Sequence, residues 1–168
     1  YQMIESDPDA GFHFPYFMYT PPASEVVDGS GNPVDGIDPR PPVVSAIVQS
    51  PSDSREEQLI NGREEILRGD ARKIAEELRT PAIVALLPET SEDRSFELLD
   101  HRSLQISDPP YERLDLQLLA MIDDARARLA DEPYTVAEQI QLCGFSNSGR
   151  FNDQFTILHP ERVNAVSS

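Results

Sequence analysis

The chain has 168 residues, a single-domain length that can build a hydrophobic core, and its formal net charge at pH 7 is -16. This excess of negative charge would repel nucleic-acid phosphates and anionic membrane surfaces, so neither is expected as a partner. No apolar stretch is long enough to span a bilayer and no charged-then-apolar leader begins the sequence, which predicts a soluble globular protein and assigns no compartment.

Acidic residues outnumber basic ones, and nearly all of the basic residues are arginine. Asp and Glu number 30 against 14 Lys and Arg, and Lys73 is the single lysine. An acidic surface with little lysine is typical of proteins adapted to high salt, and an ordinary acidic enzyme is the alternative. Cys143 is the one cysteine, so no internal disulfide forms, and we expect it to be a small buried hydrophobe. Because the sequence begins at Tyr1 and stops after an apolar segment, we expect a piece of a longer protein.

The N-terminal part is predicted to hold one strand and a long loop. Residues 1–11 are polar and turn-rich, residues 12–20 are rich in aromatic side chains and read as a strand, and Pro15 favours an edge position or a bulge for it. In the following loop, residues 28–32 resemble the start of a calcium loop. Pro33 and Pro39 stand where such a loop needs glycine and glutamate, so a solvated turn is favoured and no metal or cofactor is expected.

Three short apolar runs, residues 43–49, 82–87 and 140–143, are predicted to be buried strands. Helical periodicity separates them at residues 55–78 and 111–130, with Gly69 weakening the first helix. Alternating strands and helices predict an α/β fold with a mainly parallel sheet and flanking helices. The expected core faces are Ile60, Leu67, Ala71, Ile74 and Leu78 in the first helix, Leu114, Leu118, Ile122, Ala125 and Leu129 in the second, and Phe151, Phe155 and Leu158 in a helix that follows the last strand.

Residues 144–148, Gly-Phe-Ser-Asn-Ser, lie between the strand at 140–143 and that last helix. This order predicts a nucleophile elbow, in which Ser146 stands exposed at the tip of a sharp turn where a base can reach its hydroxyl. Small flanking residues let the turn close, although Ser148 stands where the motif usually has glycine. The start of the helix supplies amides and a positive dipole end that suit an oxyanion.

Other segments extend this pattern along most of the chain. They are residues 14–22, the helix-rich stretch from 56 to 78, residues 113–116 and the His-Pro-Glu-Arg-Val run at 159–163. Together with the elbow they resemble an α/β-hydrolase of the esterase and polyhydroxyalkanoate-depolymerase-like group. The resemblance implies that residues 1–168 are the N-terminal part of one α/β-hydrolase-like domain, incomplete at its C-terminus.

The same resemblance implies a serine hydrolase that cleaves a small-molecule or polymeric carboxylic ester through an acyl-enzyme at Ser146. The amide of Asn147 would be one oxyanion donor. The second oxyanion donor would come from the loop at residues 50–53. Pro51 has no amide hydrogen, and the Ser52 amide is favoured as this donor. No glycine-rich oxyanion motif of the lipase kind is present.

The acid and histidine of a catalytic triad are not found where the family order places them, after the serine. Asp153 and His159 lie along or at the far end of the helix that leaves the elbow, and His159 is expected to be a structural helix-end residue. His13 is expected on the surface or in packing, and His101, in a loop after a parallel strand, is a possible pocket residue. We therefore expect the acid and base in a C-terminal part outside this chain, and little turnover by the chain alone.

Two further expectations complete the sequence reading. The alternative to an enzyme is a non-catalytic α/β-hydrolase-like domain that binds a ligand or partner and keeps the elbow as structure. Residues 163–166 are predicted to form an exposed edge strand, which favours self-association through that edge of the sheet.

Overall fold

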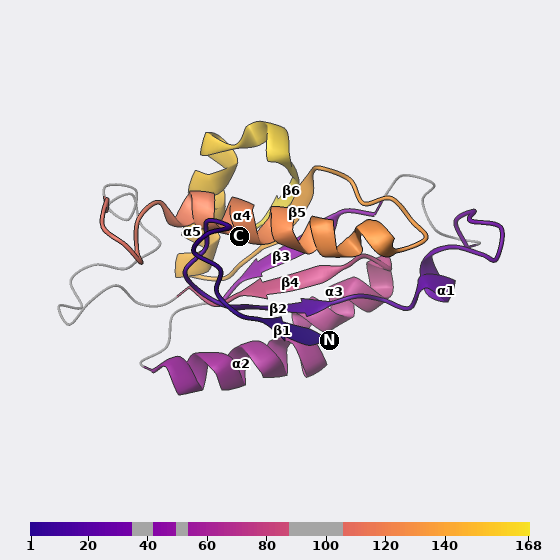
Figure 1. The fold of residues 1–168 in the computed structure, drawn as a ribbon, viewed down its shortest axis with the longest axis horizontal. Helices are drawn as coiled ribbons and strands as arrows, with labels where there is room; N and C mark the ends of the chain where they lie inside the picture. Colours follow the sequence, from indigo (N-terminus) through magenta and orange to yellow (C-terminus); the bar gives the residue numbers. More distant parts are fainter. Residues whose placement is uncertain (35–41, 50–53, 88–105) are drawn as a thin grey trace.

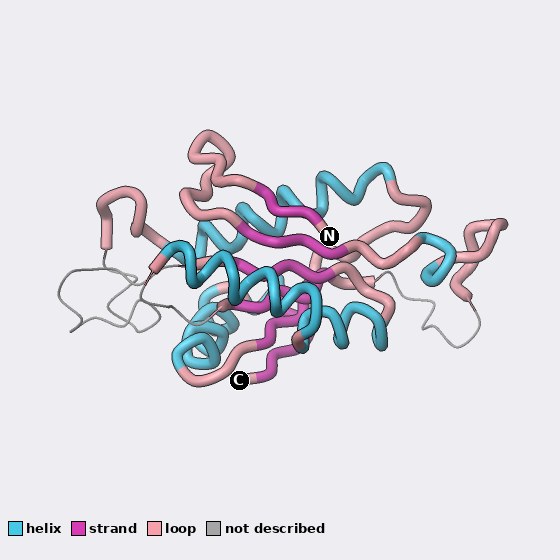
Figure 2. The backbone as a smooth tube through the Cα atoms, turned by 90° about the horizontal axis from the view of Figure 1, so that it is seen from below, coloured by secondary structure: helices cyan, strands magenta, loops and turns pink. Residues whose placement is uncertain are grey.

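A computed structural model describes residues 1–34, 42–49, 54–87 and 106–168 of the chain. In these residues a six-stranded sheet has the strand order β1-β2-β4-β3-β5-β6. The strands β4, β3, β5 and β6 are parallel, whereas β1 and β2 run antiparallel to their neighbours. The strands are β1 (Gln2–Ile4), β2 (Tyr16–Tyr19), β3 (Val44–Val48), β4 (Ala82–Ala85), β5 (Ile140–Cys143) and β6 (Val163–Ser167). Figure 2 shows the two chain termini at opposite edges of this sheet.

Helices cover both faces of the sheet (Figure 1). One face carries α2 (Arg55–Arg68) and α3 (Asp70–Leu78), and the other carries α4 (Leu114–Arg128) and α5 (Asn147–Leu158). Successive side chains of a strand point to opposite faces, so Ala46 packs in the core beneath α4 while Ile47 packs beneath α2. This three-layer arrangement confirms the predicted α/β fold with a mainly parallel sheet. The short helix α1 (Ala23–Val26) and the 3-10 turns η2 (Leu129–Asp131) and η3 (Pro160–Arg162) complete the described helices.

The three predicted buried strands are confirmed as β3, β4 and β5, but the N-terminal part differs from the prediction. Residues 1–11 were predicted to form turns, but Gln2–Ile4 form the strand β1, which pairs with β2. The strand β2 therefore lies between β1 and β4 and is not an edge strand, and Pro15 lies just before it, where its carbonyl accepts a bond from the Leu86 amide. Three residues are too few to show a clear alternating pattern, which is why the sequence did not reveal β1.

The predicted helix at 55–78 is broken at Gly69, whose backbone is extended, with φ -85° and ψ -162°. The break shifts the phase of the buried face, and the expected face is partly wrong: Ile60 and Leu78 are 51% and 54% exposed. Of the expected face, Ala71 is buried, and Leu67 and Ile74 pack against the core while partly buried. The fully buried residues are Gln58, Gly62 and Ile66 in α2 and Ala71 and Ala75 in α3.

The second predicted helix is confirmed, because all five residues of its expected stripe are buried at 2% exposure or less. The last helix is confirmed at Phe151 and Phe155, whereas Leu158, at the end of α5, is 44% exposed. Cys143, expected to be a small buried hydrophobe, packs against the core on the α2 side but is only half-buried at the end of β5.

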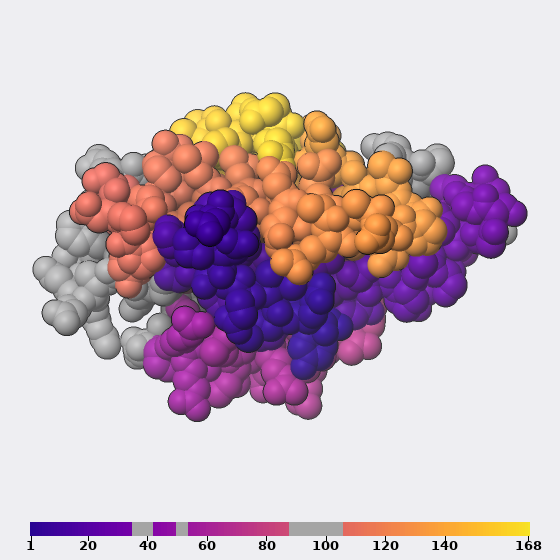
Figure 3. Space-filling model, in the orientation of Figure 1, coloured from indigo at the N-terminus to yellow at the C-terminus, as the bar shows by residue number. Residues whose placement is uncertain are grey.

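The N-terminal segment packs against α4, where the space-filling view shows indigo residues beside orange ones (Figure 3). Phe12 is fully buried and meets the Tyr16 ring at 5.8 Å between centroids. Further along, the turn at residues 28–32 is exposed, and the Asp28 carboxylate accepts the amides of Ser30 and Asn32. These bonds hold the pKa of Asp28 below its ordinary value. No helix in the described residues is long and apolar enough to cross a membrane.

Candidate active site

Ser146 lies at the turn between β5 and α5, so the strand–turn–helix order predicted for this segment is confirmed. Its backbone has φ 59° and ψ -117°, a conformation that is rare for any residue but glycine and that costs about 1–3 kcal/mol. A serine in an extended conformation before a helix would accept a bond from a helix amide. Ser146 makes no such capping bond and is exposed to solvent. Its hydroxyl is therefore displayed at the surface instead of being used to cap α5.

Gly144 allows the turn to close tightly over the start of α5. A Cβ atom built on Gly144 would lie 2.6 Å from the Asn152 side-chain nitrogen, 2.8 Å from the Ser148 carbonyl carbon and 2.9 Å from the Gly149 nitrogen. Two of these atoms belong to the backbone and have no room to move. Any side chain at residue 144 would therefore push the strand away from the helix and displace Ser146.

Asn152 is a buried polar residue that sequence reasoning missed. Its side chain is fully buried in α5 beneath the turn, and among the described residues its amide oxygen and nitrogen have no hydrogen-bond partner. Polar residues in helices are usually exposed, so the sequence carries no signal for this position.

Ser148, the residue that departs from the motif, folds back onto the turn. The Phe145 amide donates to the Ser148 hydroxyl oxygen at 2.8 Å, and the hydroxyl donates to the Phe145 carbonyl oxygen at 2.8 Å. Ser148 is 1% exposed, so water does not compete for these bonds. The residue just before Ser146 is thus held by a side chain of the helix that follows.

Asn147 is the first residue of α5. The amides of the first helical turn have no acceptor within the helix, and the first one that finds a partner inside it is that of Arg150, which donates to the Ser146 carbonyl at 3.2 Å. The Asn147 amide is therefore at the positive end of the α5 dipole, one residue from the Ser146 hydroxyl. Ser52 and the other candidates for a second oxyanion donor lie outside the described residues.

His159 is held far from Ser146 by a hydrogen bond to a buried carboxylate. It lies beyond the other end of α5, a helix of 12 residues, or about 18 Å at 1.5 Å per residue. Its Nε2 atom is 2.9 Å from the Asp115 carboxylate in α4, and the Arg113 guanidinium donates two bonds to the same carboxylate at 2.9 and 2.8 Å. These contacts agree with a structural role for His159.

Asp115 is the most deeply buried charged group in the described residues, at 1% exposure. Burial alone would raise the pKa of its carboxyl, but the bonds from Arg113 and His159 outweigh burial and hold that pKa below its ordinary value. The carboxylate therefore stays ionised and ties the beginning of α4 to the end of α5. This contact could not be predicted from the sequence, because Asp115 and His159 are 44 residues apart.

The other histidine in the described residues is also engaged away from the turn. The His13 Nε2 atom is 3.1 Å from the Glu112 carboxylate, and the His13 amide donates to the Gln117 side chain at 3.0 Å. His13 is thus a packing residue next to the start of α4. His101, the possible pocket residue, lies outside the described residues.

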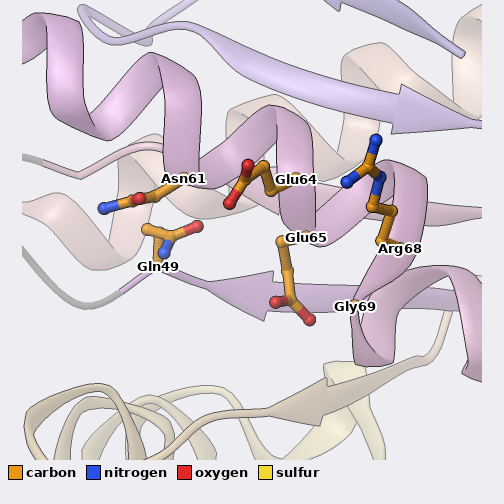
Figure 4. Close-up of a pocket in the computed structure, with 6 residues that line it drawn as sticks. All are labelled: Gln49, Asn61, Glu64, Glu65, Arg68 and Gly69. Atoms are coloured by element: carbon orange, nitrogen blue, oxygen red, sulfur yellow. The ribbon is translucent and has the colours of Figure 1, made fainter.

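An open pocket of about 410 Å³ lies on the α2 side of the sheet (Figure 4). Its lining comes from the end of β3 and from α2, and none of it comes from the turn that carries Ser146. In the close-up, Gln49 projects from the end of β3 toward Asn61 on α2. The lining residues are Gln49, Asn61, Glu64, Glu65, Arg68 and Gly69. No group of three or more histidine, cysteine or acidic side chains able to hold a metal occurs in the described residues.

Comparison with solved structures identifies the fold. The chain is similar to a structure titled as a thermostable esterase, with 20% identity, a TM-score of 0.52 and 96% of this chain covered. It is also similar to an S-formylglutathione hydrolase from Agrobacterium tumefaciens, with 14% identity, a TM-score of 0.56 and 98% of this chain covered. The fold is therefore α/β-hydrolase-like.

The chain spans 38% of the length of the first of these structures and 55% of the second. No protein-family model matches the sequence, and no curated protein matches it.

Proposed function

We propose that this protein is a serine hydrolase that cleaves a carboxylic ester through an acyl-enzyme at Ser146. The observation that carries the proposal is the exposed Ser146 hydroxyl, which is free of any helix-capping bond on a backbone held at φ 59° and ψ -117°. The Ser146 oxygen attacks the ester carbonyl, the alcohol leaves, and water then releases the acid and restores the serine. Both solved structures described above are hydrolases by their titles, which agrees with this chemistry.

The start of α5 supports the stabilisation of the oxyanion. When Ser146 attacks, negative charge develops on the carbonyl oxygen of the ester, and amides already pointing at that oxygen stabilise it without reorganisation. The Asn147 amide is one such donor in the proposal. The loop at residues 50–53 follows β3, and the Ser52 amide is the second.

The base and the acid of the triad are proposed to come from a part of the protein beyond these 168 residues. The two histidines in the described part, His13 and His159, are engaged with Glu112 and Asp115. His159 is separated from Ser146 by the whole length of α5, and His13 is bonded to Glu112 and Gln117. His101 is proposed as a wall of the substrate pocket, which takes a small-molecule or polymeric ester.

A non-catalytic binding domain is the second candidate. The engagement of both described histidines away from Ser146 is the observation that favours it, because a serine without a base loses most of its activation. The elbow would then be kept for its structure alone. Labelling of the serine separates the two candidates.

The test is covalent labelling of the full-length protein with a fluorophosphonate probe. The unaltered protein is expected to take up one label per chain, and Ser146→Ala is expected to take up none. Ser30→Ala, at an exposed serine in a turn far along the chain from α5, is the matched control and should label normally. A full-length protein that takes no label would favour the binding domain, and equal labelling of the Ser146→Ala protein would refute the assignment.

The 168-residue chain by itself is expected to turn over little or no ester, because the proposed base is not within it. If this chain hydrolyses an ester and His101→Ala abolishes the activity, the proposed position of the base is wrong. His101 would then be the base.

A further inference from the structure

The Ser148 hydroxyl makes a closed pair of hydrogen bonds with one residue. It accepts from the Phe145 amide and donates to the Phe145 carbonyl, both at 2.8 Å, in a site that is 1% exposed. The nucleophile-elbow motif usually has glycine at this position, and glycine has no group that makes either bond. The departure from the motif therefore adds an interaction to the turn.

We propose that Ser148 is a positioning residue, whose hydroxyl holds the peptide groups on both sides of Phe145 and thereby keeps Ser146 in its reactive orientation. The proposal rests on the proposed function of Ser146. It assigns to Ser148 no contact with substrate and no proton transfer.

The surroundings of Phe145 show why such a restraint matters. The Phe145 side chain is 84% exposed, so core packing does not fix this residue. The next residue, Ser146, has a strained backbone and no capping bond of its own. A strained conformation persists only where its neighbours enforce it. The two hydrogen bonds from Ser148 restrain Phe145, the residue before the strained Ser146. The absence of a side chain at Gly144 leaves room for the Ser148 backbone to lie close to the turn.

A rival explanation is that residue 148 needs only to be small. Ser148 is 1% exposed, so a large side chain would not fit there, and serine satisfies that limit as glycine does. The two explanations differ for Ser148→Gly. This variant keeps the residue small and removes the hydroxyl, whereas Ser148→Ala removes the hydroxyl and keeps the Cβ atom.

The first measurement is the rate of fluorophosphonate labelling of Ser146 in the full-length protein, separated into the binding constant KI and the maximal rate kinact. In both Ser148→Ala and Ser148→Gly, kinact is expected to fall by roughly ten- to a hundredfold, because small misplacements of a reacting group cost rate on this scale. KI is expected to stay unchanged, since Ser148 does not touch the probe. Circular dichroism verifies that each variant is folded at the temperature of the assay.

Thr156→Ala is the matched control. The Thr156 hydroxyl also donates to a backbone carbonyl in α5, that of Asn152 at 2.7 Å, but it lies in the second half of the helix. Its removal should leave kinact unchanged. A normal kinact in Ser148→Gly would overturn the proposal in favour of the size explanation, and a loss as large in Thr156→Ala would show only a general weakening of the helix.

The second measurement is independent of labelling. The Phe145 amide is expected to exchange with solvent hydrogen faster in both Ser148 variants, while amides of β5 keep their protection, as read by NMR. If the unaltered protein takes no label, the proposed function fails, and the Phe145 exchange still decides whether the Ser148 hydroxyl holds the turn. Unchanged exchange at Phe145 would overturn the proposal whatever the labelling shows.

Discussion

Asp115 is the most deeply buried charged residue in the part of the chain that the structure describes. A carboxylate at 1% exposure is tolerated because Arg113 and His159 together supply three short contacts. Removing one partner of a buried ion pair leaves the other charges without compensation. The Asp115 side chain thus fixes how the two helices on this face, α4 and α5, lie against each other.

Asp115→Asn is expected to lower the free energy of unfolding at pH 7 by about 1–3 kcal/mol, because it removes the charge-assisted bonds of a buried carboxylate while the Arg113 side chain, 45% exposed, stays in contact with solvent. The pKa of Asp115 in the folded protein lies below its ordinary value of 3.8. Its stabilising contribution is therefore complete above that ordinary value and is lost as pH falls through the lower, folded-state pKa. Urea unfolding at a series of pH values should show the two proteins converging below about pH 4.

Asp123→Asn is the control for this prediction. Asp123 lies on the same helix and pairs with Arg162 and Arg126, but its side chain is 52% exposed. An exposed pair contributes up to about 1 kcal/mol, so the variant should be nearly as stable as the unaltered protein. An Asp115→Asn protein that is no less stable than Asp123→Asn would contradict the account.

At single residues, prediction from the sequence succeeded where the position of a residue depends only on its neighbours in the chain. The position of Ser146 between a strand and a helix follows from five consecutive residues and is confirmed. The contacts of His159 and the burial of Asn152 were beyond reach, because both depend on which distant segments meet. The roles of Ser146, Asn147, Ser52 and His101 remain predictions.

At the scale of elements, α2 owes its position to a glycine. A Cβ atom on Gly62 would overlap the Leu86 side chain and would lie 3.1 Å from Phe17, so α2 packs closely on the end of β4 and on β2. The sequence predicted a helix here, but the expected face of α2 is only partly right, since Leu67 packs against the core and Ile60 is exposed. Glycine has no apolar side chain, so a count of hydrophobic residues does not find the face it occupies.

Gly62→Ala offers a test in which two effects have opposite signs. Helix propensity alone would stabilise the variant by about 1 kcal/mol. Overpacking against Leu86 costs about 1–3 kcal/mol, and we expect this effect to win. Chemical denaturation should therefore show a net loss of stability.

Glu64→Ala, at an exposed position of the same helix, is the control and should change stability by no more than about 0.5 kcal/mol. A more stable Gly62→Ala protein would mean that α2 does not approach the sheet this closely.

At the scale of the whole molecule, the described sheet ends in two edge strands, β1 and β6. The edge strand β6 pairs only with β5, and four of its five residues are exposed. Such an edge favours pairing with another strand, whereas a net charge of -16 opposes the approach of a second copy. Self-association through β6 is therefore proposed to depend on salt.

Sedimentation of the 168-residue chain is expected to show mainly monomer at low salt and association at about 1 M salt, where the screening length is about 3 Å. Val166→Lys places a charge on β6, where Val166 is 42% exposed, and should reduce the association. Met3→Lys makes the same change on β1, where Met3 is 41% exposed, and should have no such effect. A monomer at every salt concentration would contradict the proposal.

The α/β fold class was predictable because apolar runs alternate with amphipathic helices along the sequence. This order of elements is correct even though part of the buried face of the first predicted helix was predicted wrongly. Strand order was not predictable in the same way. It depends on pairings between distant segments, such as that between β3 and β5, which the described chain separates by three α-helices, a 3-10 turn and the strand β4.

We propose that Ser146, and no other serine of the turn, is the nucleophile. The most direct measurement is mass spectrometry of the peptide that contains residues 144–150, after labelling of the full-length protein with a fluorophosphonate. The structure exposes Ser146 and buries Ser148, so the account predicts that the whole adduct lies on Ser146. An adduct on Ser148, or a labelled protein in which this peptide is unmodified, would contradict it.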